Sequence, residues 1–261
     1  MTGKMLKRDI ALTIASRFAR GADRVLSWTL YLILVPALAL CGYVMWDSYQ
    51  IYAGASASDA LLQYKPSDNG SLNSPSLEEL ALVNPDIRAW LTIYDTPIDY
   101  PVLQGNDNVK YVNTDVYGEF RLSGSIFLDA SNTSDFSDGY SLLYGHHMEN
   151  DAMFGILDNF LQQEYFDEHT EGQLYLADTR YRIELFAVLE TDAYDRMVFV
   201  ASVQDAEYQS ERLEYLKENA DHYREIGVTP QDRILAMSTC AGSGTNARTI
   251  LFGRLSEVQP L

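Results

Sequence analysis

The sequence predicts a mainly β domain that follows a single membrane-spanning helix. Residues 25–46 contain no charged side chain. From residue 87 onward, short apolar segments alternate with turn residues such as Asp95-Thr-Pro97 and Gly105-Asn-Asp107. Many short strands in one domain are typical of a β-barrel or a β-sandwich. The chain has 261 residues, and the roughly 200 that follow the apolar segment suffice for one domain with its own core.

The N-terminal segment has the charge pattern of a membrane anchor. Residues 1–24 form a basic tail with a net charge of +4. Residues 25–46 would be about 33 Å long as a helix, enough to cross the hydrocarbon core. Because basic residues precede this span, we expect the N-terminus in the cytoplasm and the remaining chain outside the cell. A cleaved signal peptide is the alternative, since Ala37-Leu-Ala39 resembles a cleavage site. The apolar run continues to Trp46, which favours a retained anchor.

The anchor is followed by a predicted stalk and then by the folded domain. Residues 47–75 are assigned to an extracytoplasmic stalk because residues 53–58 and 67–71 are small and polar. The domain proper is assigned to residues 76–261. It opens with a short helix over residues 76–82, which has acidic residues in its first turn.

The interior of the domain is predicted from its apolar periodicity. We expect strands over residues 90–94, 98–104, 125–128, 141–144, 174–176, 181–189, 197–201, 234–237 and 249–255. Two helices interrupt this series, at residues 153–160 and at about 204–226. In the second helix, apolar residues recur at helical spacing between charged ones, which indicates core packing.

Charge and cysteine content exclude several classes of function. The net charge is −18, and residues beyond Arg24 account for −22. An acidic body argues against nucleic-acid binding, which needs clustered basic side chains. The sequence contains no calcium-binding loop of the EF-hand type. Its two cysteines, Cys41 and Cys240, form no disulfide framework, because Cys41 lies in the membrane span.

Cys240 is the candidate nucleophile. It follows the apolar run of residues 234–237, and the glycine-rich residues 241–245 come after it as a predicted turn. A reactive group at the end of a strand is held firmly and stays accessible. The alternative is a small buried core residue, since free cysteine is often buried.

A nucleophilic thiol needs a base, and the chain has four histidines. His146 and His147 follow the apolar residues 141–144, at the end of a predicted strand. His169 lies in a polar turn, and His222 lies on the predicted acidic helix, where we expect a surface or capping role. A turn histidine pair without a catalytic role is the alternative for His146 and His147. A metal site is disfavoured because no cluster of further ligands accompanies them.

Two arginines follow the cysteine. If residues 234–237 and 249–255 pair as antiparallel neighbours, Arg248 lies near the thiol, and its fixed cationic fork suits a developing oxyanion. Arg254 would lie at the far end of the same strand, so Arg248 is the stronger candidate.

These motifs, in this order, resemble the sortases, and class B sortases in particular. The resemblance covers residues 76–255. The family's Thr-Leu-x-Thr-Cys signature corresponds to Ala236-Met-Ser-Thr-Cys240, with Ala236 and Met237 as departures. The other matching stretches are Asn84-Pro-Asp-Ile-Arg-Ala-Trp90, Ile98-Asp-Tyr-Pro-Val-Leu-Gln104, Gly124-Ser-Ile-Phe-Leu-Asp129, Leu143-Tyr-Gly-His-His-Met148 and Asn246-Ala-Arg-Thr-Ile-Leu-Phe-Gly-Arg-Leu255.

The resemblance implies a fold and a set of roles. The fold would be an eight-stranded sortase-type β-barrel with an N-terminal helix and a long helix inserted before the cysteine strand. Cys240 would attack the carbonyl of a sorting-signal threonine, His146 would be the acid and base, and Arg248 would hold the substrate oxyanion. Ser238 and Thr239 would contact the substrate. His147 falls at a variable family position.

The resemblance also implies the partners. The acyl-enzyme would be resolved by an amine from a peptidoglycan cross-bridge or a pilin lysine, on the outer face of a Gram-positive membrane, without metal or cofactor. Wall anchoring and pilin polymerisation both stay open. A membrane-tethered cysteine peptidase that uses water is the alternative enzyme, and a non-catalytic binding domain with a buried thiol is the alternative outside enzymes.

Overall fold

The computed structural model describes residues 2–55, 59–66, 75–148, 150–240 and 246–257. The chain divides into two compact units, Met1–Gln50 and Ile51–Leu261. In the first, helix α1 (Thr2–Ala55) carries the one segment of the described chain, Thr13–Tyr49, that is long and apolar enough to cross a membrane. Its mean hydropathy is 2.0. The predicted span of residues 25–46 lies inside this segment.

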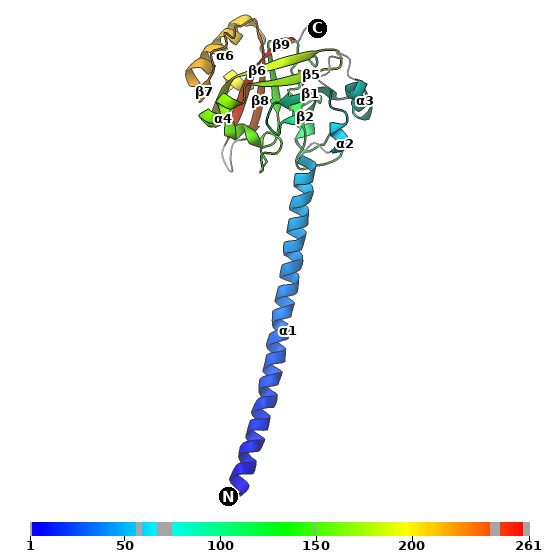
Figure 1. The fold of residues 1–261 in the computed structure, drawn as a ribbon, viewed down its shortest axis with the longest axis vertical. Helices are drawn as coiled ribbons and strands as arrows, with labels where there is room; N and C mark the ends of the chain where they lie inside the picture. Colours follow the sequence, from blue (N-terminus) through cyan, green and yellow to red (C-terminus); the bar gives the residue numbers. More distant parts are fainter. Residues whose placement is uncertain (1, 56–58, 67–74, 149, 241–245, 258–261) are drawn as a thin grey trace. The chain divides into compact units, whose positions relative to one another are not determined.

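The second unit is a closed β-barrel (Figure 1). Of the nine strands in the described residues, eight form the ring: β1 (Ile87–Ile93), β2 (Asp99–Leu103), β3 (Ile126–Leu128), β4 (Tyr140–Tyr144), β5 (Glu171–Tyr175), β6 (Arg180–Asp192), β8 (Arg233–Cys240) and β9 (Ala247–Glu257). They follow the order β5-β1-β2-β3-β4-β8-β9-β6, and pairing of β5 with β6 closes the ring. The eight-stranded, mainly β fold expected from the sequence is therefore confirmed.

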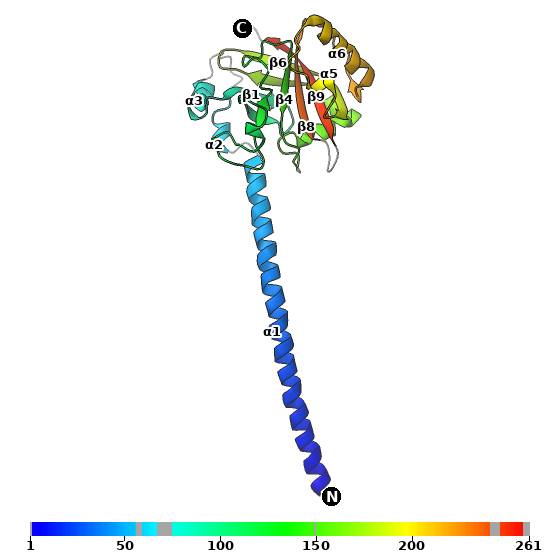
Figure 2. The same ribbon diagram turned by 180° about the vertical axis from the view of Figure 1, so that it is seen from behind.

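Helices cover the outside of the barrel. The short helices α2 (Asp59–Leu62) and α3 (Pro75–Val83) lie at one side, and α5 (Arg196–Phe199) and α6 (Ala206–Asn219) lie beside β8 and β9 at the other (Figure 2). The 3₁₀ helices η1 (Lys110–Val112) and η2 (Gly155–Leu161) and the helix α4 (Gln163–Glu168) complete the unit. α3 matches the helix predicted over residues 76–82, and the 3₁₀ helix η2 occupies most of the region predicted as helix at 153–160, whereas α4 was not predicted.

Side chains that alternate in direction along the strands contribute to two layers of the hydrophobic core. On β8, Leu235 and Met237 point into the barrel, whereas Ile234 and Ala236 pack on the layer beneath α5 and α6. Side chains of successive strand residues face opposite ways, so one strand serves both layers. This explains the uninterrupted apolar run of β8, because both of its faces are buried.

Two predicted elements are wrong. Residues 197–201 form no strand but the helix α5 and the residues after it, because the Asp195 side chain caps the helix by accepting a hydrogen bond from Met197 N. A short apolar run cannot distinguish a buried strand from a buried helix turn. The helix predicted to reach residue 226 ends at Asn219, and strand β7 (His222–Tyr223) pairs with β6.

The predicted stalk is partly described. Its first residues belong to α1, and Leu61 on α2 is buried in a cluster that includes Leu80 of α3. Lys65 forms an ion pair with Asp99 at 2.8 Å. Residues 67–71 and 241–245, predicted as a linker and a turn, lie outside the described residues. The predicted domain limits remain a prediction.

Candidate active site

Three strand ends meet at one edge of the barrel. β4 and β8 are parallel, with Tyr144 opposite Ser238, and β8 and β9 are antiparallel, with Cys240 opposite Arg248. The antiparallel pairing of β8 and β9 meets the condition under which the sequence places Arg248 near the thiol. Because β4 ends beside Ser238, the residues that follow it reach the same edge as the end of β8 and the start of β9. The ladder therefore brings His146, Cys240 and Arg248 to one edge.

A pocket of about 390 Å³ opens at this edge. Four of the residues predicted for the site line it, namely His146, Ser238, Thr239 and Arg248. The other lining residues are Asn108, Val112, Phe127, Tyr144, Gly145, Ala193 and Phe199. The structure describes Cys240 by its backbone, at the end of β8, and its side chain lies outside the described part.

His146 is held by three hydrogen bonds around it. Gly145 N donates to Ser238 O at 3.1 Å, and Phe154 N donates to His146 O at 3.0 Å. The imidazole Nε2 lies 2.7 Å from the carbonyl oxygen of Val112. A side chain at Gly145 would collide with Ile126 and Phe154, since a Cβ there would stand 2.5 and 2.6 Å from their atoms. The glycine before the histidine is thus required by close packing.

His147 faces a different partner. Its Nε2 lies 3.0 Å from Asp158 Oδ2, and Asp158 Oδ1 accepts a hydrogen bond of 2.7 Å from Thr249 Oγ1. His147 is not among the residues that line the pocket. Asp158 on η2 therefore links the segment after β4 to β9, one residue away from His146 and from Arg248.

The two arginines of β9 have separate environments. Arg248 lines the pocket, and its Nη1 donates to Ala247 O at 2.9 Å. Among the described residues, no carboxylate pairs with Arg248. Arg254 lies at the other end of the strand and pairs with Glu184, which accepts from both Nε and Nη2 at 3.0 and 2.8 Å. The guanidinium of Arg254 is thus committed to the fold, and that of Arg248 faces the pocket.

Ser238 and Thr239 are almost fully buried, each with 2% of its surface exposed. Within the described chain, Thr239 Oγ1 has no hydrogen-bond partner.

The remaining histidines serve the fold. His169 stacks on Tyr165 and its Nδ1 lies 2.8 Å from Tyr165 O. His222, expected on a helix, lies on β7 instead, and its Nε2 lies 2.8 Å from Leu161 O. Neither residue lines the pocket.

Sequence reasoning missed the wall that faces the strand ends. Asn108 lines the pocket, and its Nδ2 donates to Asp129 Oδ2 at 2.8 Å while its Oδ1 accepts from Ala130 N at 2.7 Å. Tyr144 Oη donates to the same carboxylate oxygen at 2.8 Å. Burial and the neighbouring Asp129 raise the pKa of Tyr144 well above its ordinary value, so it stays a neutral donor. Asp129 is the last residue of the Gly124-to-Asp129 motif, and this motif was the one feature of the sequence that pointed to this wall of the pocket.

Phe199 and Ala193 also line the pocket, from the connection between β6 and α6. The fully buried Arg212 of α6 fixes this connection, because its Nε and Nη2 donate to Met197 O and Val200 O at 2.8 and 3.0 Å. Its guanidinium also lies 3.7 Å from the centre of the Tyr140 ring. A buried side chain thus holds the short helix α5 in place.

Comparison with known proteins defines the family. A family model for the sortase domain matches residues 91–256. Sortase B of Staphylococcus aureus (strain NCTC 8325 / PS 47) is 30% identical over 233 residues, which cover 87% of this chain and 95% of that protein. Sortase B of Listeria monocytogenes is 34% identical over 175 residues, which cover 66% of this chain and 69% of that protein.

Solved structures agree with this relationship. A Staphylococcus aureus sortase B–substrate complex superposes with a TM-score of 0.66 at 29% identity, covering 71% of this chain and 86% of that one. A Streptococcus pyogenes class B sortase involved in pilus biogenesis superposes with a TM-score of 0.62 at 39% identity, covering 69% and 97%. The chain belongs to the sortase family, whose members are transpeptidases that act on peptide bonds. Its relatives are class B sortases.

Proposed function

We propose that this chain is a class B sortase in which Cys240 cleaves a C-terminal sorting signal after threonine and passes the protein to an amine. The observation that carries the proposal is the strand register, which sets Cys240 opposite Arg248 and brings the chain after β4 to the same edge. His146 and Arg248 both line the pocket there. A base and a cation that line one pocket, with a nucleophile opposite the cation on the neighbouring strand, are the parts that acyl transfer needs.

The reaction proceeds by two acyl transfers. In the reactive pair, the thiol proton has passed to His146, leaving a thiolate and an imidazolium. The thiolate forms a thioester with the threonine carbonyl, and the departing amide nitrogen takes the proton from His146. An incoming amine then attacks the thioester, gives a proton to the neutral imidazole and releases Cys240.

Arg248 stabilises the oxygen that becomes negative in both steps. Its guanidinium faces the pocket and pairs with no carboxylate of the described chain. An unpaired, planar cation with several N–H donors suits a substrate carbonyl whose charge develops during the reaction. Ser238 and Thr239 contact the bound sorting signal on the floor of the same pocket.

The reaction takes place on the outer face of the cytoplasmic membrane of a Gram-positive cell. Residues 25–46, within the apolar segment Thr13–Tyr49 of α1, are the anchor, the basic tail of residues 1–24 stays in the cytoplasm, and the barrel lies outside. The acceptor amine comes from a peptidoglycan cross-bridge or from a pilin lysine. The similar Streptococcus pyogenes enzyme takes part in pilus biogenesis, which supports the second source.

The test uses a sorting-signal peptide library, two amine acceptors and the full-length protein in detergent. We expect a ligated product and a trapped acyl-enzyme, and we expect Cys240→Ala to lower both at least about 10³-fold. Cys41→Ala is the matched control, because Cys41 is the other cysteine of the chain, and it should keep full activity.

Three outcomes would decide against the proposal. If Cys240→Ala joins the peptide normally, the cysteine mechanism fails. If the wild-type protein cleaves the peptide but forms no ligated product at high amine concentration, the chain is a peptidase that uses water. If an alkylating agent leaves native Cys240 unmodified and the peptide intact, the domain is a binding module.

A further inference from the structure

We propose that the main-chain carbonyl of Val112 sets the tautomer of His146, so that Nδ1 is the nitrogen that gives and takes the proton. This inference rests on the proposed function, because it assigns the atom through which the acid–base residue acts. Two motifs far from the cysteine hold that carbonyl. They are Asn84-Pro-Asp86, at the end of α3, and Gly124, before β3.

The first step is the contact itself. His146 Nε2 lies 2.7 Å from Val112 O. A carbonyl oxygen only accepts hydrogen bonds, so Nε2 carries the hydrogen in both the neutral and the charged imidazole. The proton that is exchanged therefore resides on Nδ1. In Ser-His-Asp sites a carboxylate selects the tautomer in the same way, and a backbone carbonyl is a known substitute for it.

The position of Val112 in its segment makes this oxygen available. Val112 is the last residue of η1, and the last carbonyls of a helix have no partner within it. Val112 N donates to Val109 O at 3.2 Å, which closes the turn. The carbonyl thus points out of a closed turn, toward the pocket residue His146.

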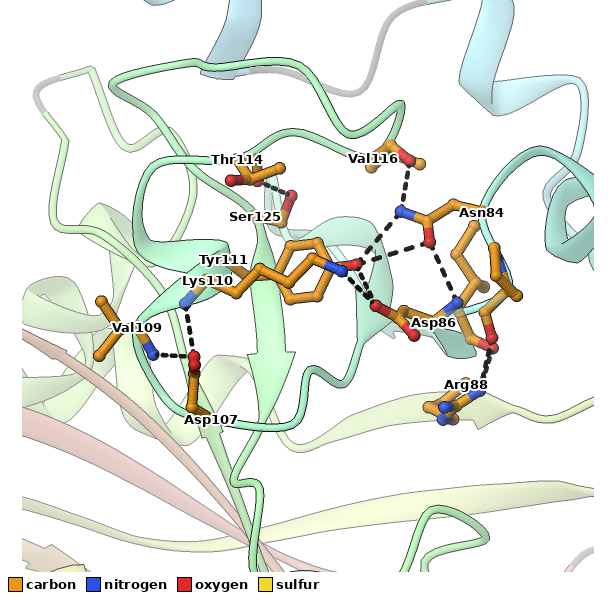
Figure 3. Close-up of polar contacts among 12 residues, drawn as sticks. Asn84, Asp86, Arg88, Asp107, Val109, Lys110, Tyr111, Thr114, Val116 and Ser125 are labelled. Carbon is orange, nitrogen blue, oxygen red and sulfur yellow. Dashed lines mark hydrogen bonds and ion pairs between the residues drawn. The ribbon is translucent and has the colours of Figure 1, made fainter.

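A polar cluster anchors η1 from the side of α3 (Figure 3). Tyr111 Oη and Lys110 Nζ both donate to Asp86 Oδ2 at 2.7 Å. Asn84 Nδ2 donates to Tyr111 Oη at 3.3 Å, and Asp86 N donates to Asn84 Oδ1 at 3.0 Å. Tyr111 is fully buried. The residue directly before Val112 is therefore fixed both by packing and by its hydroxyl group.

Gly124 packs closely against the main-chain carbonyl of Val112. Its φ is +57°, and a Cβ built there would stand 2.3 Å from Val112 O and 2.5 Å from Tyr111 O. Ser125 N donates to Tyr111 O at 3.0 Å, and Ser125 Oγ donates to Thr114 O at 2.8 Å (Figure 3). Only a residue without a side chain fits this position, so the motif that begins at Gly124 forms a cradle around Val112.

The experiment compares two glycines of one loop in the full-length protein in detergent micelles. Gly124→Ala forces Val112 O to move, whereas Gly118→Ala has a similar positive φ of +83° and meets no atom of the described chain within 4 Å. Both variants carry the backbone strain of alanine at positive φ, so their difference reports the displaced carbonyl. We measure kcat, KM and the ¹⁵N spectrum of labelled histidine, with His146→Gln to assign the signals.

We expect neutral His146 of the wild type to carry its hydrogen on Nε2. Gly124→Ala should mix the two tautomers and lower kcat about 10- to 100-fold with KM little changed. Gly118→Ala should keep the wild-type tautomer and kcat. If Gly124→Ala does not fold, Tyr111→Phe replaces it, with an expected fall in kcat of about fivefold and a partial shift of tautomer.

Two results would overturn the inference. One is a wild-type His146 with its hydrogen on Nδ1, and the other is a folded Gly124→Ala variant, or Tyr111→Phe in its place, with the tautomer and kcat of Gly118→Ala. Both results can be distinguished from failure of the proposed function, because in that case the wild-type protein would form no ligated product. The tautomer of the wild type is read without any substrate, so it tests the inference in either case.

Discussion

The pocket has two walls that are built by different means. The sheet wall consists of the pocket residues on or just after strands, which are Phe127, Tyr144, Gly145, His146, Ser238, Thr239 and Arg248. The loop wall consists of Asn108 and Val112 from the β2–β3 connection and of Ala193 and Phe199 from the β6–α6 connection. Backbone ladders hold the strands of the first wall, and hydrogen bonds made by side chains hold the second.

The two walls also differ in what they contribute to the site: the sheet wall carries the reacting side chains, and the loop wall positions them. In the sheet wall, the backbone ladder sets Cys240 opposite Arg248 and Tyr144 opposite Ser238, so main-chain pairing aligns these strand ends. In the loop wall, Asp86 holds Tyr111 and Lys110, and Arg212 holds α5. We therefore expect substitutions in the sheet wall to lower activity by removing a reacting group, and substitutions behind the loop wall to act through the position of that wall and through stability.

The largest expected difference in activity is between variants of the two adjacent histidines, His146 and His147. His146→Ala should lower acyl transfer at least about 10²-fold, because it removes the group that exchanges the proton. His147→Ala should keep most activity and lose about 1 kcal/mol of unfolding free energy, because it breaks one hydrogen bond to Asp158. Steady-state ligation and urea unfolding of both variants measure this contrast. Equal loss of activity in the two variants would contradict the assignment of the acid–base role to His146.

A smaller contrast is expected between the two arginines of β9. Arg248→Lys keeps the charge but loses the fork, and kcat should fall at least about tenfold while stability stays near that of the wild type. Arg254→Lys is the matched control on the same strand. It breaks the paired hydrogen bonds to Glu184, so it should cost about 1–2 kcal/mol of stability and leave kcat unchanged. Wild-type rates in Arg248→Lys would remove this residue from the site.

The sheet wall could be predicted from the sequence because each of its strands carries a local signal. The apolar runs at residues 141–144 and 234–237 mark buried strands, and the polar residues directly beyond them mark strand ends. His146 and Arg248 were found in this way, by position relative to a strand, and both line the pocket. Which strands are neighbours rests on long-range pairing, and residue spacing alone did not establish it.

The loop wall has no comparable signal. Asn108 lies in a polar stretch without periodicity, and Val112 contributes its backbone oxygen, which every residue possesses. Helix α5 was mistaken for a strand, because its stability comes from the Asp195 cap and from Arg212 rather than from a local pattern. Strand β7 was likewise missed, since its pairing partner β6 lies more than 30 residues earlier in the chain.

The smallest expected effect tests whether acid loosens the loop wall before the sheet wall. Burial alone would raise the pKa of Asp86, but the hydrogen bonds from Lys110 and Tyr111 outweigh it and lower that pKa below its ordinary value of 3.8. A carboxyl whose pKa is lowered in the folded state adds stability above its unfolded pKa, and this contribution disappears as the pH falls through the folded pKa. The wild type should therefore be more stable than Asp86→Asn at pH 6 by less than about 1 kcal/mol.

The pH dependence makes this prediction specific. As the pH falls below about 4, the stability difference between wild type and Asp86→Asn should shrink, because protonated Asp86 no longer attracts Lys110. Hydrogen exchange of the amides of Lys110 and Tyr111 reports the loop, and the amides of Leu235 and Met237 on β8 report the ladder. After correction for the intrinsic exchange rate at each pH, the extra protection of the loop amides in the wild type over Asp86→Asn should shrink in acid, while the ladder amides keep equal protection in both proteins. A stability difference that stays constant from pH 6 to pH 3 would show that the carboxylate charge does not hold the loop wall, and its anchor would then be the packing of Tyr111 alone.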